Sequence, residues 1–191
     1  MRAEAIVIDT KRTTKKVAGK KAAKKAAKEQ AFLDEFYQYG ADVLDSEDYY
    51  RCAPYIQHGN VSTLDHQISV SCMCLKLAKL SHAKYDYYSL IRAALLHDFF
   101  LYDWHDHDGT RKPLEHGFQH GSTALANAAD DFSISPIEAN SIRYHMFPLT
   151  MPPRYREGMI LSIADKICTV KESIAREPYY KDIIRKVKNA H

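Results

Sequence analysis

The sequence predicts an all-α protein, a helical bundle with no significant sheet. Apolar side chains recur at steps of three and four residues over long stretches, which is the spacing of one helix face. The segment from Ser135 to Glu138 is typical of a helix start, with serine as the cap, Pro136 at the first position and glutamate at the third. No segment alternates apolar and polar residues convincingly, so we expect helices throughout.

Three helices are expected in the first half of the bundle. Phe32, Leu33 and Phe36 fit a helix over residues 31–40 that ends at Gly40. A second helix is expected over residues 45–57, with Pro54 as a kink. A third covers residues 63–80, with Thr63 as its candidate cap. Its apolar stripe consists of Leu64, Ile68, Cys72, Leu75 and Ala78.

The second half begins with a helix over residues 88–100 that is apolar enough to be buried on most sides. A polar loop over 103–115 follows, and then a helix of small residues over 120–131 that we expect to pack closely against a neighbour. The helix begun by Ser135 ends near His145, before turn-rich residues. The last long helix covers 155–176, with its apolar stripe at Met159, Ile160, Ile163, Ile167 and Val170.

Charge and composition divide the 191 residues into three predicted parts. Residues 1–30 carry a net charge of +7, so the rest of the chain carries −4. This Lys/Ala-rich segment lacks large apolar residues over most of its length and is predicted to be a disordered tail, although alanine and lysine also favour a frayed or partner-induced helix. Residues 31–176 form the predicted domain, and 177–191 a short basic helix or tail. The tail is either a weak tether to nucleic acid or an anionic surface, or a solvated extension.

The remaining composition favours a cytoplasmic globular protein. The four cysteines show neither a paired zinc-binding spacing nor a secreted disulfide framework. No apolar run approaches the ~20 residues needed to span a bilayer, and the short N-terminal apolar patch is too broken for a secretory signal. We therefore expect no membrane contact, while the oligomeric state is left open.

None of the ten histidines occurs before His58, and the adjacent pair His97-Asp98 stands directly after a run of apolar residues expected to be buried. A single histidine on a helix is more often a surface residue or a hydrogen-bonded core residue than a ligand. Asp98 alone could cap the following loop, and Asp165 alone could pair with Lys166 or a nearby arginine. Together they predict a site, because a buried His-Asp pair without partners is costly. A carboxylate has two oxygens and can bridge two metals. Six such residues from five helices would make a two-metal centre: His66, His97, Asp98, His120, His145 and Asp165.

These residues resemble the H…HD…D signature of the HD-domain metal-dependent phosphohydrolases, over roughly residues 55 to 175. The matching segments are YIQHGNVSTLDHQISVS, AALLHDFFLYDWH, EHGFQHGSTALANA, IRYHMFPL and SIADKICTVKE. They are similar to a bacterial branch known only as phosphohydrolases of unassigned substrate. The two further histidines resemble the six-ligand variant of that superfamily, which has a binuclear site.

The resemblance implies a ligand set for each metal. One metal would be held by His66, His97, Asp98 and Asp165. The second would be held by Asp98, His120 and His145, with Asp98 as the bridge. The implied activity is hydrolysis of a phosphate ester, a nucleotide or a related small molecule, through a metal-activated water. Iron, manganese, cobalt, nickel, zinc and magnesium all remain candidates.

Further residues are candidates for contact with a phosphate substrate. Catalytic roles are predicted for Asp98, for Lys166 beside a proposed ligand, and for His116. His116 and His58 could each act as a general acid, as a phosphate contact or as a hydrogen-bond partner of a ligand. Substrate-binding roles are predicted for His58, Arg143 and Arg154. Ordinary solvation is the alternative for the basic residues.

Two other functions remain open at this stage. The same six ligands suit a di-iron oxygenase, and the chain could also be a nucleotide-binding signalling module without turnover. Phe99-Phe100-Leu101 follows the pair, and no Gly-Tyr-Pro motif occurs in the chain. This departs from the cyclic-dinucleotide phosphodiesterases of the superfamily and leaves the substrate unassigned.

Overall fold

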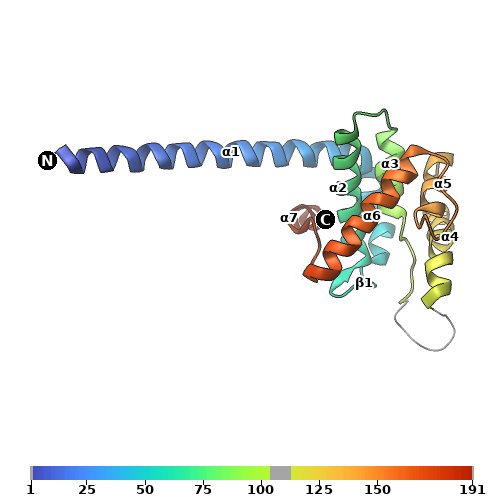
Figure 1. Ribbon diagram of the computed structural model, residues 1–191. Helices are drawn as coiled ribbons and strands as arrows, with labels where there is room; N and C mark the ends of the chain where they lie inside the picture. Colours follow the sequence, from blue (N-terminus) through green and yellow to red (C-terminus); the bar gives the residue numbers. More distant parts are fainter. Residues whose placement is uncertain (1, 104–112, 191) are drawn as a thin grey trace. The chain divides into compact units, whose positions relative to one another are not determined.

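The computed structural model is built almost entirely from helices, which confirms the predicted all-α class. It describes residues 2–103 and 113–190, with side chains described for 19–103 and 118–190. The elements are α1 (Arg2–Leu44), the 3-10 helix η1 (Glu47–Cys52), β1 (Ile56–His58), β2 (Val61–Ser62), α2 (Thr63–Ser81), α3 (Tyr87–Leu96), α4 (Pro113–Asp131), α5 (Pro136–Tyr144), α6 (Arg156–Ala175) and α7 (Lys181–Asn189) (Figure 1).

The chain divides into two compact units, residues 1–35 and residues 36–191. The first unit is helical from Arg2. This agrees with the helix that alanine and lysine favour, the alternative to a disordered tail. In the second unit, α2 packs against both α3 and α6, and α5 contacts α3, α4 and α6. Helix α7 contacts α2, and its side chains Ile183, Ile184 and Val187 are buried.

Two predictions in the first half of the chain are wrong in detail. Helix α1 does not end at Gly40 but continues to Leu44. A Cβ at Gly40 would lie 2.9 Å from Leu95 Cδ1, so this glycine lets α3 approach α1 closely. The predicted helix over 45–57 is instead η1 followed by the strand β1, because Pro54 has no amide hydrogen with which to continue a helix. Strand β1 pairs antiparallel with β2 around Gly59, which has a φ of 56°.

The helix starts agree more closely with the sequence. Ser135 caps α5 with the predicted capping box, in which the serine hydroxyl accepts from the Glu138 amide and the Glu138 carboxylate accepts from the Ser135 amide. Helix α2 begins at Thr63 as expected, but its cap is Ser62, whose hydroxyl accepts from the Asp65 amide. Helix α3 ends at Leu96, so the predicted helix over 88–100 stops before the His97-Asp98 pair.

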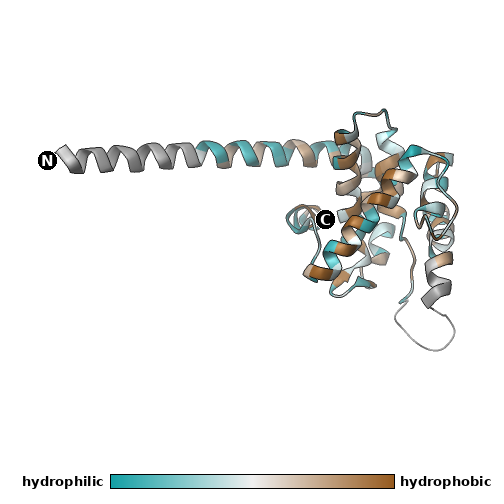
Figure 2. Cartoon of the chain, in the orientation of Figure 1, coloured by the Kyte–Doolittle hydropathy of each residue, from teal (hydrophilic) through white to brown (hydrophobic). Residues whose placement is uncertain are grey.

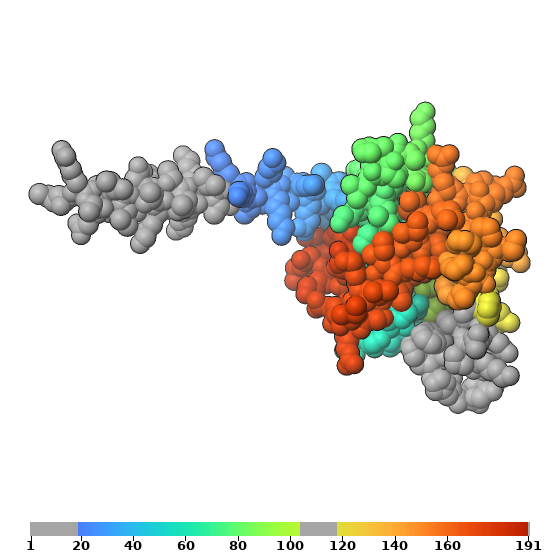
Figure 3. Space-filling model, viewed as in Figure 1, coloured from blue at the N-terminus to red at the C-terminus, as the bar shows by residue number. Residues whose placement is uncertain are grey.

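Helix α6 has the predicted length, but part of its apolar stripe faces solvent. Ile163 is 46% exposed and Val170 59% exposed, and Ile174 continues the same stripe. Brown positions along α6 are visible on the face shown in Figure 2, and α6 crosses that face in Figure 3. The buried side of α6 instead carries polar residues with small or apolar ones: Glu157, Leu161, Ala164, Asp165, Cys168 and Glu172.

Candidate metal centre

The structure brings the six proposed ligands together inside the second unit, and all six side chains are buried. His66 lies in the first turn of α2, His97 and Asp98 directly follow α3, and Asp165 lies in the middle of α6. His120 belongs to α4, and His145 caps the C-terminus of α5.

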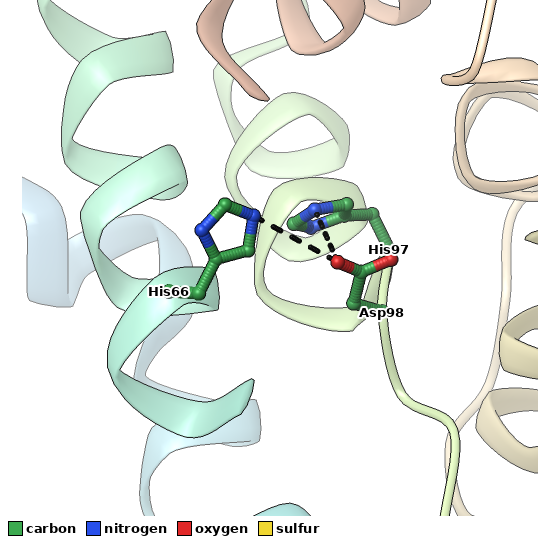
Figure 4. A group of neighbouring side chains, drawn as sticks. All are labelled: His66, His97 and Asp98. Atoms are coloured by element: carbon green, nitrogen blue, oxygen red, sulfur yellow. Dashed lines mark ion pairs between the residues drawn. The ribbon is translucent and has the colours of Figure 1, made fainter. Parts of the chain in front are cut away.

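The first group consists of His66, His97 and Asp98, whose candidate ligand atoms all lie within 4.8 Å of one another. The Oδ2 atom of Asp98 lies 3.7 Å from Nε2 of His66 and 3.3 Å from Nε2 of His97. Figure 4 shows both imidazole rings turned towards this carboxylate. Asp165 adjoins the group, with its Oδ1 3.2 Å from Nε2 of His66 and 3.9 Å from Nε2 of His97.

The second group consists of Asp98, His120 and His145. The other carboxylate oxygen of Asp98, Oδ1, lies 3.3 Å from Nε2 of His120 and 3.6 Å from Nε2 of His145. Asp98 thus presents one oxygen to each group. The two imidazole nitrogens of this group are 2.9 Å apart.

A glycine allows α4 and α5 to approach closely enough for this contact. A Cβ at Gly121 would lie 2.9 Å from the carbonyl oxygen of Ile142 and 3.0 Å from that of Arg143. The backbones of the two helices therefore touch beside His120 and His145. This agrees with the expectation that the small-residue helix packs closely against a neighbour.

Three of the histidines have their outer ring nitrogen occupied by a hydrogen bond. The Nδ1 atom of His97 lies 2.8 Å from the carbonyl oxygen of Ala94, and that of His145 lies 2.7 Å from the carbonyl oxygen of Ile142. Both carbonyls belong to the last turn of the helix that the histidine caps. Because Nδ1 must donate to a carbonyl, Nε2 of each neutral ring keeps its lone pair for the centre.

The third outer hydrogen bond joins two helices. The Nδ1 atom of His66 lies 2.7 Å from Oε2 of Glu172, a fully buried carboxylate of α6. Glu172 also accepts from the amide of Tyr179 through Oε1. A carboxylate behind a histidine orients the ring and increases its basicity, an arrangement that recurs around protein metal sites.

The donor atoms fit a divalent metal. Nε2 of His97 and Oδ1 of Asp98 are buried and have no hydrogen-bond partner among the residues that the structure describes. A buried polar atom without a partner costs about 1–3 kcal/mol. Imidazole nitrogens with carboxylate oxygens form a ligand set that several divalent transition metals accept, so a bound metal would satisfy these atoms.

The buried groups of the candidate centre change one another's pKa values. Burial raises the pKa of Asp98, but His97 and His120 outweigh it and lower the pKa well below its usual range. Burial lowers the pKa of His66, but hydrogen bonds to Asp165 and Glu172 reverse the effect and raise it to about 10. Burial and the neighbouring histidines lower the pKa of His145 to about 3. The second group therefore keeps a neutral imidazole.

Sequence reasoning missed two buried side chains that contact the ligands. Nε2 of Gln57, on β1, donates to Oδ2 of Asp98 at 2.7 Å, and Glu172 accepts from His66. Glu172 follows Asp165 by seven residues, so the two share a helix face, and that spacing could have indicated it. No local signal in the sequence distinguishes Gln57.

The proposed substrate contacts lie at different distances from the centre. His58 is partly buried, with its ring centroid 5.3 Å from that of His66. Arg143 and Arg154 are exposed and lie over the rings of Tyr144 and Tyr155, and no described contact joins them to the six ligands. The side chain of His116 lies outside the described residues.

The side chain of Lys166 contacts the backbone of a proposed ligand residue, His145. Its ammonium donates to the carbonyl oxygen of His145 at 3.3 Å and to the hydroxyl and carbonyl oxygens of Ser162 at 3.0 and 3.2 Å. Burial lowers the pKa of Lys166. In this position the lysine supports the end of α5.

No described helix is both long and apolar enough to cross a membrane. Comparison of the chain with family models, with curated proteins and with solved structures finds no match.

Proposed function

We propose that this chain is a metal-dependent phosphohydrolase of the HD-domain type, acting on a phosphate ester such as a nucleotide or a related small molecule. The observation that carries the proposal is the shared carboxylate of Asp98, whose two oxygens face two different pairs of histidines. This is the arrangement that a binuclear centre requires of a bridging ligand.

In this proposal, His66, His97 and Asp165 would hold one metal and His120 and His145 the other, and Asp98 would contribute one oxygen to each. Divalent metals bound there would acidify a water, polarise a phosphoryl oxygen and stabilise the charge of the leaving group.

The other residues prepare the ligands and receive the substrate. The hydrogen bonds to Ala94, Ile142 and Glu172 hold three imidazole rings with Nε2 directed inward. Lys166 contributes positive charge beside His145, and His116 is the proposed general acid. His58 is the proposed substrate contact nearest to the ligands.

The test combines metal analysis of the purified chain with a phosphate-release screen. Substrates would include p-nitrophenyl phosphate, bis-p-nitrophenyl phosphate and mono-, di- and cyclic nucleotides, each with Fe²⁺, Mn²⁺, Co²⁺, Ni²⁺, Zn²⁺ and Mg²⁺. We expect turnover that disappears on chelation and returns with one of these metals. Phosphate release that survives metal stripping would contradict the proposal.

Variants separate the centre from the rest of the chain. His97→Ala and Asp98→Asn should both reduce metal content, and should lower turnover by more than the roughly 10–100-fold that loss of an outer partner costs. His82→Asn is the matched control, because His82 is exposed and has a φ of 54°, which asparagine tolerates. Oxygen consumption with an organic substrate and no phosphate release would instead favour the di-iron oxygenase.

A further inference from the structure

Between residues 19 and 28 of helix α1, the lysines lie on one side of the helix. Lys20, Lys21, Lys24, Lys25 and Lys28 are all exposed, and we call them the lysine face. At 100° per residue they lie within an arc of about 140°, over about 12 Å of helix axis. The arrangement concentrates five positive charges on one side of this exposed stretch.

The opposite side of the same stretch carries only small side chains. Ala22, Ala23, Ala26 and Ala27 occupy the remaining arc, and they too are exposed. A Cβ placed at Gly19 would meet nothing within 4 Å. Helices that lie in a membrane surface place tryptophan, phenylalanine or leucine opposite their cations, and no such residue occurs between 19 and 28. A lipid surface would therefore gain little from burying this side.

The net charges of the two units differ in sign, which favours binding of a polyanion to the first unit. Residues 1–35 hold ten Lys/Arg and five Asp/Glu, a net charge of +5, so residues 36–191 carry −2 and a polyanion would be attracted to the first unit rather than to the second. The lysine face carries five charges in about 12 Å, and duplex DNA carries one negative charge per about 1.7 Å of axis. The two densities are of the same order.

We propose that the lysine face binds duplex DNA through the phosphate backbone, without sequence preference. No aromatic residue lies between 19 and 28, so stacking on unpaired bases is not available there. The major groove of B-DNA, about 12 Å wide, admits an α-helix, whereas the major groove of A-form RNA is deep and narrow. This inference goes beyond the proposed hydrolase function and does not rest on it.

The test measures fluorescence anisotropy of a fluorescein-labelled 20-base-pair DNA duplex with the full chain between 50 and 200 mM NaCl. Five phosphate contacts predict that the logarithm of affinity falls with that of salt with a slope of about −4.5. Replacing all five lysines of the face by glutamine should reduce the steepness by about 0.9 for each phosphate that is no longer neutralised. Glutamine has nearly the helix propensity of lysine, and circular dichroism would check that the helix is kept.

The control removes the same charge elsewhere. Lys76, Lys79, Lys84, Lys181 and Lys186 are exposed in the second unit, and their glutamine variant should bind the duplex as the unaltered chain does. Equal weakening in both variants, or in neither, would overturn the proposal. Equal or tighter binding to an RNA duplex, to poly-glutamate or to phosphatidylcholine vesicles with 30% phosphatidylserine would also overturn it.

Discussion

Glu172 is not a proposed ligand, but its hydrogen bond orients one of the proposed ligands, His66. It is fully buried, and one of its oxygens accepts from His66 while the other accepts from the amide of Tyr179. The carboxylate therefore ties the orientation of a proposed ligand to the backbone that follows α6.

Glu172→Gln should weaken metal binding roughly 10-fold or more, because the amide is a poorer acceptor for the imidazole N–H than the carboxylate. Competition with a chromophoric chelator would measure the dissociation constant. Glu177→Gln is the control, since Glu177 is exposed and pairs only with Lys181 among the described contacts. Unchanged affinity in the Glu172 variant would show that this hydrogen bond does not support the centre.

At this scale, the sequence is enough to name six residues whose side chains lie close together in the second unit. His97-Asp98 is informative because a polar pair after Leu95 and Leu96 requires a buried partner. Gln57 and Glu172 cannot be named in this way. Their hydrogen bonds span 41 and 106 residues and depend on how β1 and α6 pack.

The start of helix α5 depends on the capping box at Ser135. The serine hydroxyl accepts from the amide of Glu138 at 3.2 Å, and Oε2 of Glu138 accepts from the amide of Ser135 at 2.6 Å. The helix that these bonds begin ends at Tyr144 and is followed by its C-cap His145, so the position of the helix also sets the position of a proposed ligand.

Ser135→Ala should lower the free energy of unfolding by about 1 kcal/mol, because the Glu138 amide loses its acceptor. Urea titration followed by circular dichroism would measure the change. Ser133→Ala is the control: its side chain is exposed, and the contact it makes with Arg92 uses the carbonyl oxygen. An equal loss in both variants would exclude a capping effect.

Helices are predicted well where local chemistry decides them, and poorly where packing does. The capping box of α5 and the length of α6 follow from short-range bonds and spacing. Gly40 resembles a helix end because glycine often follows one, but contact with Leu95 decides its role. The apolar spacing of α6 likewise identifies a stripe but not which side is buried, since Asp165 and Glu172 occupy the inner side.

Arg92 joins three helices of the second unit. Its Nε donates to Glu138 of α5 at 2.6 Å, and another guanidinium nitrogen pairs with Asp42 of α1. A third donates to the carbonyl oxygen of Ser133 at 2.7 Å. The guanidinium is nearly fully buried, so its loss should destabilise the packing of the helices that it joins.

Arg92→Met should lower the free energy of unfolding by about 3–5 kcal/mol, because Glu138 would keep a buried charge without its cation. Chemical denaturation would measure it. The comparison is Arg51→Gln, which breaks pairs of a half-exposed arginine with Asp48 and Asp131 and should cost about 1 kcal/mol or less. Similar losses in the two variants would contradict the role assigned to the buried network.

The four cysteines report on the packing of the whole second unit. Cys52, Cys72, Cys74 and Cys168 are buried as free thiols, and burial raises the pKa of each. Because the thiolate is the reactive form, we expect no rapid reaction of the native chain with Ellman's reagent and four thiols titrated in guanidinium chloride. Rapid labelling of the native chain at any one of them would contradict this packing.

The close packing at Gly121 predicts that this position tolerates substitution poorly. Its side chain is a single hydrogen, so it offers nothing to a metal, a proton or a substrate. Even so, any larger residue would press on the carbonyl oxygens of Ile142 and Arg143 and separate His120 from His145. In a scan of all substitutions at every position, Gly121 should therefore be as intolerant as the proposed ligands. A residue without any functional group would then help to locate the candidate centre.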